Sequence, residues 1–176
     1  RRQRQMCIRD RYLDSLRNEE INYRLTNKLD SLRCILSTGS PLISDTFDYV
    51  YKNIKSDVHL ASISGGTDIV SCFVAGNPNL PVFSGEIQCK CLGVDVDVFD
   101  EHGQSTGDKG ELVCKNSLPS MPIGFWKDKQ NQAYIDTYFK TYPNTWSQGD
   151  FAKITNNNGI VIYGRSDATL NPGGCL

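Results

Sequence analysis

The stretch RCILSTGSPLISDTFDYVYKNIKSDVHLASI, residues 33–63, decides the fold class of this chain. Short apolar runs at 33–36 and 57–63 have the length and composition of buried strands. Between them, four apolar residues recur at the i, i+3, i+4, i+7 spacing of one helix face: Phe47, Val50, Tyr51 and Ile54. A strand, a helix and a strand in this order predict a βαβ unit, with parallel strands and a right-handed crossover.

The ends of the predicted helix carry capping and charge signals. Ser44 is a suitable N-cap, because its side-chain oxygen can accept a hydrogen bond from an unpaired backbone N–H of the first turn. Acidic Asp45 lies near the positive end of the helix dipole and basic Lys55 near the negative end. We therefore expect Ser44 to be the N-cap and the helix to begin directly after it.

The chain on either side of this unit has a different character. Residues 12–31 are loosely helical, and residues 82–164 predict short strands separated by turn clusters. We expect these strands at 85–93, 94–100, 110–115, 150–154 and 159–164. In VDVDVF, valines alternate with aspartates, so one face of that strand is buried and the other is solvated. The predicted fold class is an α/β segment followed by an antiparallel β-barrel-like subdomain.

The composition excludes several classes of function. The hydrophobic content of 39% is ordinary for a globular protein, and the formal net charge of −1 argues against a nucleic-acid groove. No apolar run reaches the roughly 18 residues of a membrane-spanning helix, so we expect no membrane partner and a cytoplasmic location. The seven cysteines include no CxxC pair and only two histidines are present, which favours reduced thiols over a zinc site.

Two loops follow the strands of the βαβ unit, STGSP at 37–41 and SGGTD at 64–68. Parallel strands place both loops at the carboxyl edge, where open α/β sheets bind ligands. The hydroxyl of Thr67 can donate to a phosphate oxygen, and the carboxylate of Asp68 can hold Mg²⁺. The alternatives are structural: a strand-to-helix turn with Pro41 in the first helical turn, and a plain hairpin turn.

Two further polar groups accompany the later strands. Asp150 follows Gly149 at the start of a predicted strand, and an ionised aspartate there can accept both hydroxyls of a ribose. Arg165 and Asp167 come just after the strand at 159–164, and the Arg165 guanidinium can donate to a ribose or a phosphate. The alternatives are that Asp150 is an ordinary turn residue and that Arg165 forms a surface salt bridge.

The order and spacing of these stretches give the chain its resemblance to a known family. The motifs LSTGSPL, ASISGGTDIVSCF, GELVCKNSLPSMPIGFWKD, WSQGDF and GRSDATLNPGG resemble those of the adenylate-forming acyl-CoA synthetase superfamily. The resemblance runs from about residue 12 to 174, and within the superfamily it is greatest to members that act on acetoacetate. It implies a large N-terminal domain in which α/β subdomains join a distorted β-barrel. It also implies an enzyme that activates a carboxylate with ATP as an acyl-adenylate, releases pyrophosphate and passes the acyl group to CoA.

The resemblance assigns most of the adenylate site to the two carboxyl-edge loops. The residues that it places around the adenine are Gly39, Ser40 and Pro41, with part of Ser64, Gly65 and Gly66. It implies that Thr67 binds the α-phosphate and that Asp68 holds Mg²⁺, at a position where the superfamily more often has glutamate. Thr67 and Asp68 are therefore the expected catalytic residues, and ATP (bound as AMP), CoA and Mg²⁺ are the expected cofactors.

Further roles follow from the same resemblance. Asp150 would hold the ribose hydroxyls, Arg165 would contact the ribose, and Asp167 would be the hinge before a small C-terminal domain. Gly65 stands where acetate-specific relatives carry a tryptophan, which implies room for the longer acid acetoacetate.

The resemblance also divides the chain. Residues 1–11 form a leader outside the family, for which an artefact is one interpretation, and 12–81 form the α/β segment of the adenylation domain. Residues 82–164 form the barrel-like subdomain, and 165–176 the hinge and the truncated start of the small domain. The family's phosphate-gripping loop and catalytic lysine are not found, so we expect a central fragment that is inactive alone and needs the remaining parts of the enzyme. The alternatives are a non-catalytic nucleotide-binding or interaction fragment, and a ligase for another short-chain acid.

Overall fold

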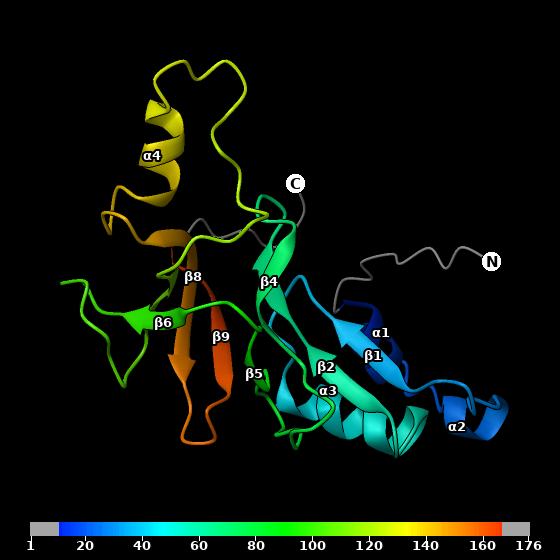
Figure 1. Cartoon of the computed structure of the whole chain (residues 1–176). Coiled ribbons are helices and arrows are strands. Elements are labelled where there is room, and N and C mark those ends of the chain that lie inside the picture. The colour runs from blue at the N-terminus through cyan, green and yellow to red at the C-terminus, as the bar shows by residue number, and fades with distance from the viewer. Residues whose placement is uncertain (1–10, 167–176) are drawn as a thin grey trace.

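The computed structural model describes residues 11–166 (Figure 1). Its helices are α1 (Arg11–Asn18), α2 (Tyr23–Thr26), α3 (Ser44–Tyr49), the π-helical η1 (Val50–Ile54) and α4 (Gln132–Tyr138). Its strands are β1 (Cys34–Ser37), β2 (His59–Ser62), β3 (Ser64–Gly66), β4 (Ser71–Ala75), β5 (Cys89–Lys90), β6 (Val96–Phe99), β7 (Gly110–Cys114), β8 (Trp146–Ile154) and β9 (Ile160–Arg165). They form three sheets, of two, three and four strands. Asp167, the expected hinge, lies outside the described residues.

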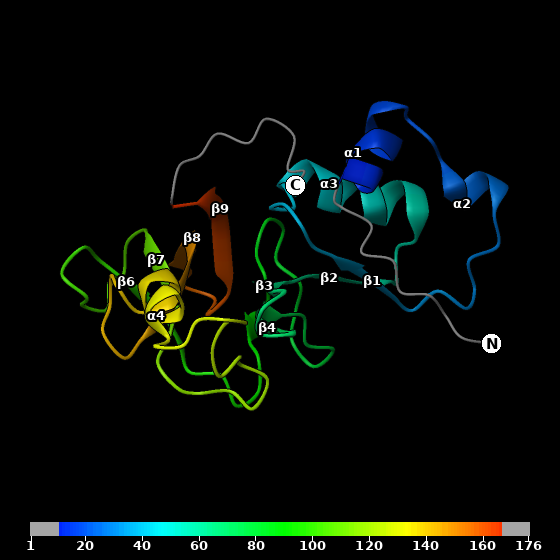
Figure 2. The ribbon, with the colours of Figure 1, turned by 90° about the horizontal axis from the view of Figure 1, so that it is seen from above.

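The βαβ unit is confirmed. Strands β1 and β2 pair in parallel, with Cys34 opposite His59 and Ser37 opposite Ser62. Figure 2 shows helices α1 and α3 together on one side of this pair. The apolar face of α3 and η1 packs between α1 and the sheet, and Phe47, Val50 and Leu60 are almost completely buried there. The periodicity in the sequence therefore identified the buried side of this helix correctly.

The predicted helix boundaries were less accurate. The N-cap of α3 is Ile43, in extended conformation and without a side-chain capping bond, so the prediction that Ser44 caps the helix is wrong by one position. The loosely helical segment at 12–31 contains two short helices, α1 and α2. Glu20 adopts a left-handed conformation (φ 52°) just after α1, and this ends the helical path before α2 begins.

The SGGTD stretch is a hairpin rather than a free loop at the edge of the parallel sheet. After Ile63, whose N–H still bonds the Ser37 carbonyl, the chain leaves β2 and forms β3. Strand β3 pairs antiparallel with β4, and the residues between them form a tight turn in which the Val70 N–H bonds the Thr67 carbonyl. The structural alternative of a hairpin turn is therefore correct for the backbone, and it leaves Thr67 and Asp68 at the tip.

The later strands form a four-stranded antiparallel sheet in the order β6-β7-β8-β9. Val96 and Val98 are buried and their aspartate neighbours are not, which confirms the alternation in VDVDVF. Strand β8 begins at Trp146, four residues before the predicted strand. Helix α4 was not predicted, and it lies against β8 with its Tyr138 buried.

The β3–β4 hairpin packs into the core of the four-stranded sheet. Ile69, Phe73 and Val74 are fully buried in one cluster with residues of β6, β7, β8 and β9, including Leu112. The βαβ unit has a separate core. The division of the chain at 81/82 stays a prediction. Within residues 11–166, none of the helices is long and apolar enough to pass through a bilayer.

We predict that Phe73→Ala lowers the free energy of unfolding by about 3–5 kcal/mol, because it empties a fully buried site that anchors the hairpin. Leu92→Ala is the matched control, since Leu92 is fully exposed, and it should change stability by less than about 0.5 kcal/mol. Urea unfolding followed by tryptophan fluorescence measures both. Equal effects of the two substitutions would contradict the assigned core.

Candidate functional site

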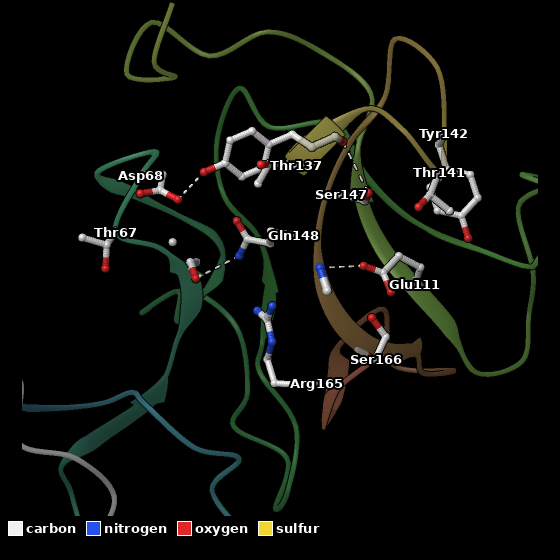
Figure 3. Close-up of a pocket in the computed structure, with 14 residues that line it drawn as sticks. Thr67, Asp68, Glu111, Thr137, Thr141, Tyr142, Ser147, Gln148, Arg165 and Ser166 are labelled. Atoms are coloured by element: carbon white, nitrogen blue, oxygen red, sulfur yellow. Dashed lines mark hydrogen bonds between the residues drawn. The ribbon is translucent and has the colours of Figure 1, made fainter. Parts of the chain in front are cut away.

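A cavity of about 710 Å³ lies between the tip of the β3–β4 hairpin, strands β7 and β8, and helix α4 (Figure 3). Its lining residues come from parts of the chain far apart in sequence: Gly65, Gly66, Thr67, Asp68, Glu111, Thr137, Tyr138, Thr141, Tyr142, Ser147, Gln148, Gly149, Arg165 and Ser166. The volume falls in the range of typical small-molecule sites. Five residues of the predicted adenylate site therefore share one hollow: Gly65, Gly66, Thr67, Asp68 and Arg165.

Other predicted site residues lie outside this lining. Residues 39–41 and Ser64 are not part of the cavity wall. The loop at 37–41 nevertheless starts next to the hairpin, because the Ser37 carbonyl bonds the N–H of Ile63 just before β3. The adenine contacts assigned to these residues stay a prediction.

Asp150 lies immediately behind the cavity wall, and it is buried within strand β8. Its Oδ1 is 3.5 Å from Nη1 of Arg165, which pairs with it across the β8–β9 ladder. Its Oδ2 accepts a hydrogen bond of 3.0 Å from Nε2 of Gln148. Asp150 is thus part of a charged network and not a turn residue. The ion pair of Arg165 is with this site aspartate, although the arginine itself is half-exposed.

Gln148 is a site residue that the sequence reasoning missed. Its Nε2 donates to the Gly65 carbonyl at 3.0 Å as well as to Asp150, so one amide joins the hairpin to strand β8. Trp146 Nε1 donates to its Oε1 at 3.3 Å, which fixes the direction of the amide. Figure 3 shows this side chain between the hairpin and the strand. Only its place just before Gly149 and Asp150 in the sequence hinted at a role.

Asp68 has a buried partner that the sequence did not reveal. The hydroxyl of Tyr138 donates to its Oδ2 (Figure 3). The Tyr138 ring stacks on Trp146, with ring centroids 3.6 Å apart and planes 14° from parallel. Burial raises the pKa of Tyr138 well above its usual value, and the Asp68 carboxylate raises it further. The phenol therefore stays protonated at neutral pH and acts as a fixed donor to Asp68.

Glu111 is a second carboxylate of the cavity that was not predicted. Its Oε1 accepts a hydrogen bond of 2.8 Å from the backbone N–H of Gly149. Burial raises the pKa of Glu111, while hydrogen bonds from Ser166 and Gly149 oppose the rise. The nearby Asp150 carboxylate raises this pKa and the Arg165 guanidinium lowers it. Among the described lining residues the charges are two carboxylates and one guanidinium, and most of the other polar groups are hydroxyls.

Gly65 lines the cavity with its backbone, but a side chain at this position would point at strand β4 and not into the cavity. A Cβ built on it would overlap the backbone oxygen of Ser71 and lie 2.6 Å from Cα of Cys72, so the position faces strand β4. A tryptophan at this position cannot be accommodated without disrupting the β3–β4 pairing. The inference that Gly65 itself leaves room for a longer acid does not fit this backbone. A Cβ on Gly66 would instead meet the end of the Gln148 side chain, 2.7 Å from its Oε1.

The carboxylates of the cavity can hold Mg²⁺ only together with oxygen atoms of a bound substrate. Within residues 11–166 no group of three or more His, Cys, Asp or Glu side chains is arranged to hold a metal ion. Mg²⁺ is, however, commonly held by one or two carboxylates together with substrate phosphates and water. Asp68 at the hairpin tip can provide one such carboxylate.

Comparison with known proteins supports the resemblance seen in the sequence. No family model matches the chain. It is 54% identical over 165 residues to acetoacetyl-coenzyme A synthetase of Rhizobium meliloti and 45% identical over 166 residues to acetoacetyl-CoA synthetase of Mus musculus. Each alignment covers 93% of this chain and 25% of the relative, so the chain spans about a quarter of the length of these curated relatives.

Solved structures agree. The structure of acetoacetyl-CoA synthetase from Streptomyces lividans matches with a TM-score of 0.82 and 41% identity, over 93% of this chain and 26% of that one. An anthranilate CoA ligase in complex with anthranoyl-AMP matches with a TM-score of 0.71 and 19% identity, over 93% of this chain and 30% of that one, which shows a shared fold.

The chain therefore shares its fold with a segment of these two CoA ligase structures, and the predicted fold class is confirmed. Within that class, the chain is homologous to a segment of the acetoacetyl-CoA synthetases.

We predict that Gln148→Leu lowers the free energy of unfolding by about 1–3 kcal/mol, because it leaves the half-buried Gly65 carbonyl and the buried Asp150 carboxylate without this donor. Gln130→Leu is the control, since Gln130 is exposed, and it should have little effect. Chemical denaturation of both variants tests this. A Gln148 variant as stable as the control would show that the amide bridge contributes nothing.

Proposed function

We propose that this chain provides the AMP-binding centre of an acetoacetate–CoA ligase. The complete reaction would convert acetoacetate, ATP and CoA to acetoacetyl-CoA, AMP and pyrophosphate through an acyl-adenylate. The observation that carries the proposal is the convergence of Thr67, Asp68 and Arg165 on one cavity, with Asp150 directly behind its wall. Homology to acetoacetyl-CoA synthetases supports the choice of acid. The reaction and a cytoplasmic location are proposed for the longer protein that those relatives represent.

The polar groups of the cavity suit the ribose and the α-phosphate. Asp150 is an acceptor-only carboxylate when ionised, and ribose hydroxyls are donors, so a ribose next to β8 would bond to it. The guanidinium of Arg165 reaches the same region and can donate to ribose or phosphate oxygens. Thr67 presents a hydroxyl at the hairpin tip, on the opposite side of the cavity, where it would donate to the α-phosphate (Figure 3).

The adenine would lie beside residues 39–41 and the start of β3. This assignment is supported by the hydrogen bond from the Ile63 N–H to the Ser37 carbonyl at the end of β1, because it brings the 37–41 loop next to the hairpin. The three parts of AMP would thus follow the chain from the β1 loop, across the hairpin, to β8.

Mg²⁺ would be held by Asp68, and when bound it neutralises charge on the phosphates. The hydrogen bond from Tyr138 goes to Oδ2 of Asp68 and orients the carboxylate. Oδ1 is the atom that we propose to bind Mg²⁺. Attack of a carboxylate on the α-phosphorus brings two anions together, and donors and cations must stabilise the charge that develops. Arg165 is the single cation in the described lining. We propose that the further cations lie in segments that correspond to the part of the longer relatives not covered by this chain.

We predict that AMP binds to this chain and that Asp150→Ala weakens the binding about 10–100-fold, because hydrogen bonds to the ribose from a charged acceptor are lost. Isothermal titration calorimetry with AMP measures the two dissociation constants. Asp108→Ala is the control, because the Asp108 carboxylate is 92% exposed and lies outside the cavity. Equal affinities for all three proteins would contradict the proposed site.

We predict that Asp68→Asn selectively removes the contribution of magnesium. The wild-type chain should bind ATP more tightly with Mg²⁺ than without it, whereas in the variant this advantage should fall about tenfold, since an amide lacks the charge of the carboxylate ligand. Titrations with ATP in the presence of Mg²⁺ or of a chelator give the comparison. An unchanged magnesium advantage would exclude Asp68 as the metal ligand, and Asp108→Asn, exposed and outside the cavity, is the control.

A further inference from the structure

The site residues of β8 lie in a break of the sheet ladder. Glu111 of β7 pairs with Phe151, but Val113 pairs with Ser147, so one residue of β7 stands opposite three of β8: Gln148, Gly149 and Asp150. Gly149 adopts a left-handed conformation there, with φ 81°. Bulges of this kind bend a strand and redirect its side chains, and they recur next to active sites. We refer to residues 148–150 as the β8 bulge.

A bulge leaves backbone groups without their ladder partners, and a buried backbone group without a partner is costly. In the β8 bulge, the N–H of Gly149 donates to the side chain of Glu111 at 2.8 Å instead of to a carbonyl of β7. The carbonyl of Gly149 accepts from the N–H of Ser166 at 2.9 Å. Both backbone groups of Gly149 are therefore held from the pocket side.

The two residues that flank Gly149 carry the polar groups of the site. Gln148 and Asp150 are joined to each other by the 3.0 Å hydrogen bond, and Gln148 also reaches the Gly65 carbonyl of the hairpin. Residues two apart already share a face of a regular strand, and the left-handed backbone of Gly149 between them bends the strand and sets how this face is presented to the cavity. The contact that fixes this turn consequently fixes the direction of the Asp150 carboxylate.

We propose that Glu111 is a positioning residue of the nucleotide site: its carboxylate holds the β8 bulge and thereby presents Asp150 to the ribose. The inference rests on the proposed function for its ligand, but the contact between Glu111 and Gly149 can be tested without any ligand. Glu111 acts through the backbone of Gly149 and is not assigned a direct role in the reaction.

The carboxylate also makes the bulge sensitive to pH. Burial raises the pKa of Glu111, and the charged groups that face it are Asp150, which raises the pKa, and Arg165, which lowers it. A carboxyl whose pKa is higher in the folded than in the unfolded state loses stabilisation as pH rises through the interval between the two values. That interval begins near the ordinary glutamate value of 4.5. The Glu111-dependent part of the stability should therefore fall as pH rises above this value.

The test uses chain labelled with ¹⁵N-glycine, which gives 15 glycine amide signals by NMR. In the wild type, the Gly149 amide proton should shift as Glu111 titrates, and this shift should vanish in Glu111→Gln. In Glu111→Ala the Gly149 amide should exchange with solvent at least about tenfold faster, and AMP should bind at least about tenfold more weakly. Glu111→Gln keeps an acceptor oxygen, so it should restore most of the exchange protection and most of the AMP affinity.

Glu101→Ala is the matched control, because Glu101 is exposed and lies outside the cavity, and it should change neither readout. A Gly149 amide that does not titrate in the wild type overturns the proposal even if the alanine variant fails to fold. So does a folded Glu111→Ala variant with unchanged exchange and unchanged AMP affinity. Absence of AMP binding to the wild-type chain contradicts the proposed function instead, while the titration of the Gly149 amide still decides whether Glu111 holds the bulge.

Discussion

The burial of the β3–β4 hairpin in the core of the four-stranded sheet is the constraint on which the site depends. The hairpin directly follows the βαβ unit in the chain, yet Ile69, Phe73 and Val74 pack with β6, β7 and β8. This packing brings Thr67 and Asp68 opposite strand β8, where hydrogen bonds then fix the details. Gln148 joins the Gly65 carbonyl to Asp150, and Tyr138 orients Asp68. Without the apolar anchor, residues more than 80 positions apart would have no reason to form one cavity.

The charges of the cavity bear on the role that we propose for this chain. Hydroxyl groups, two carboxylates and one guanidinium suit recognition of a ribose and one phosphate, with a metal ion to balance the acids. They do not suit stabilisation of a triphosphate by themselves. The chain spans about a quarter of the length of its curated relatives, and the proposal assigns the remaining cationic groups to the rest of that length.

The features that the sequence predicted correctly arise from local patterns. The 3.6-residue period identified the buried face of α3 and η1, and the two-residue period identified Val96 and Val98. The N-cap was placed one residue late because the extended Ile43 takes that position without using its side chain. Helix α4 escaped notice because its seven residues, QAYIDTY, show too little of an apolar period.

The features that could not be predicted depend on contacts between distant segments. Nothing near SGGTD indicates that the chain leaves the parallel sheet there. The hairpin alternative is correct for the backbone and the tip of the hairpin lines the cavity, while the phosphate and metal contacts of this stretch stay a prediction. Gln148, Tyr138 and Glu111 meet their partners 83, 70 and 38 residues away. The position of Gly65 against β4 could likewise be seen only once the pairing of β3 was known.

A crystal structure of this chain grown with AMP tests most directly whether the hairpin and strand β8 form one nucleotide site. We expect a single AMP in the cavity, with its ribose hydroxyls at the Asp150 carboxylate and its phosphate at the Thr67 hydroxyl. AMP bound elsewhere on the chain, or in the cavity without contact to either residue, would contradict it.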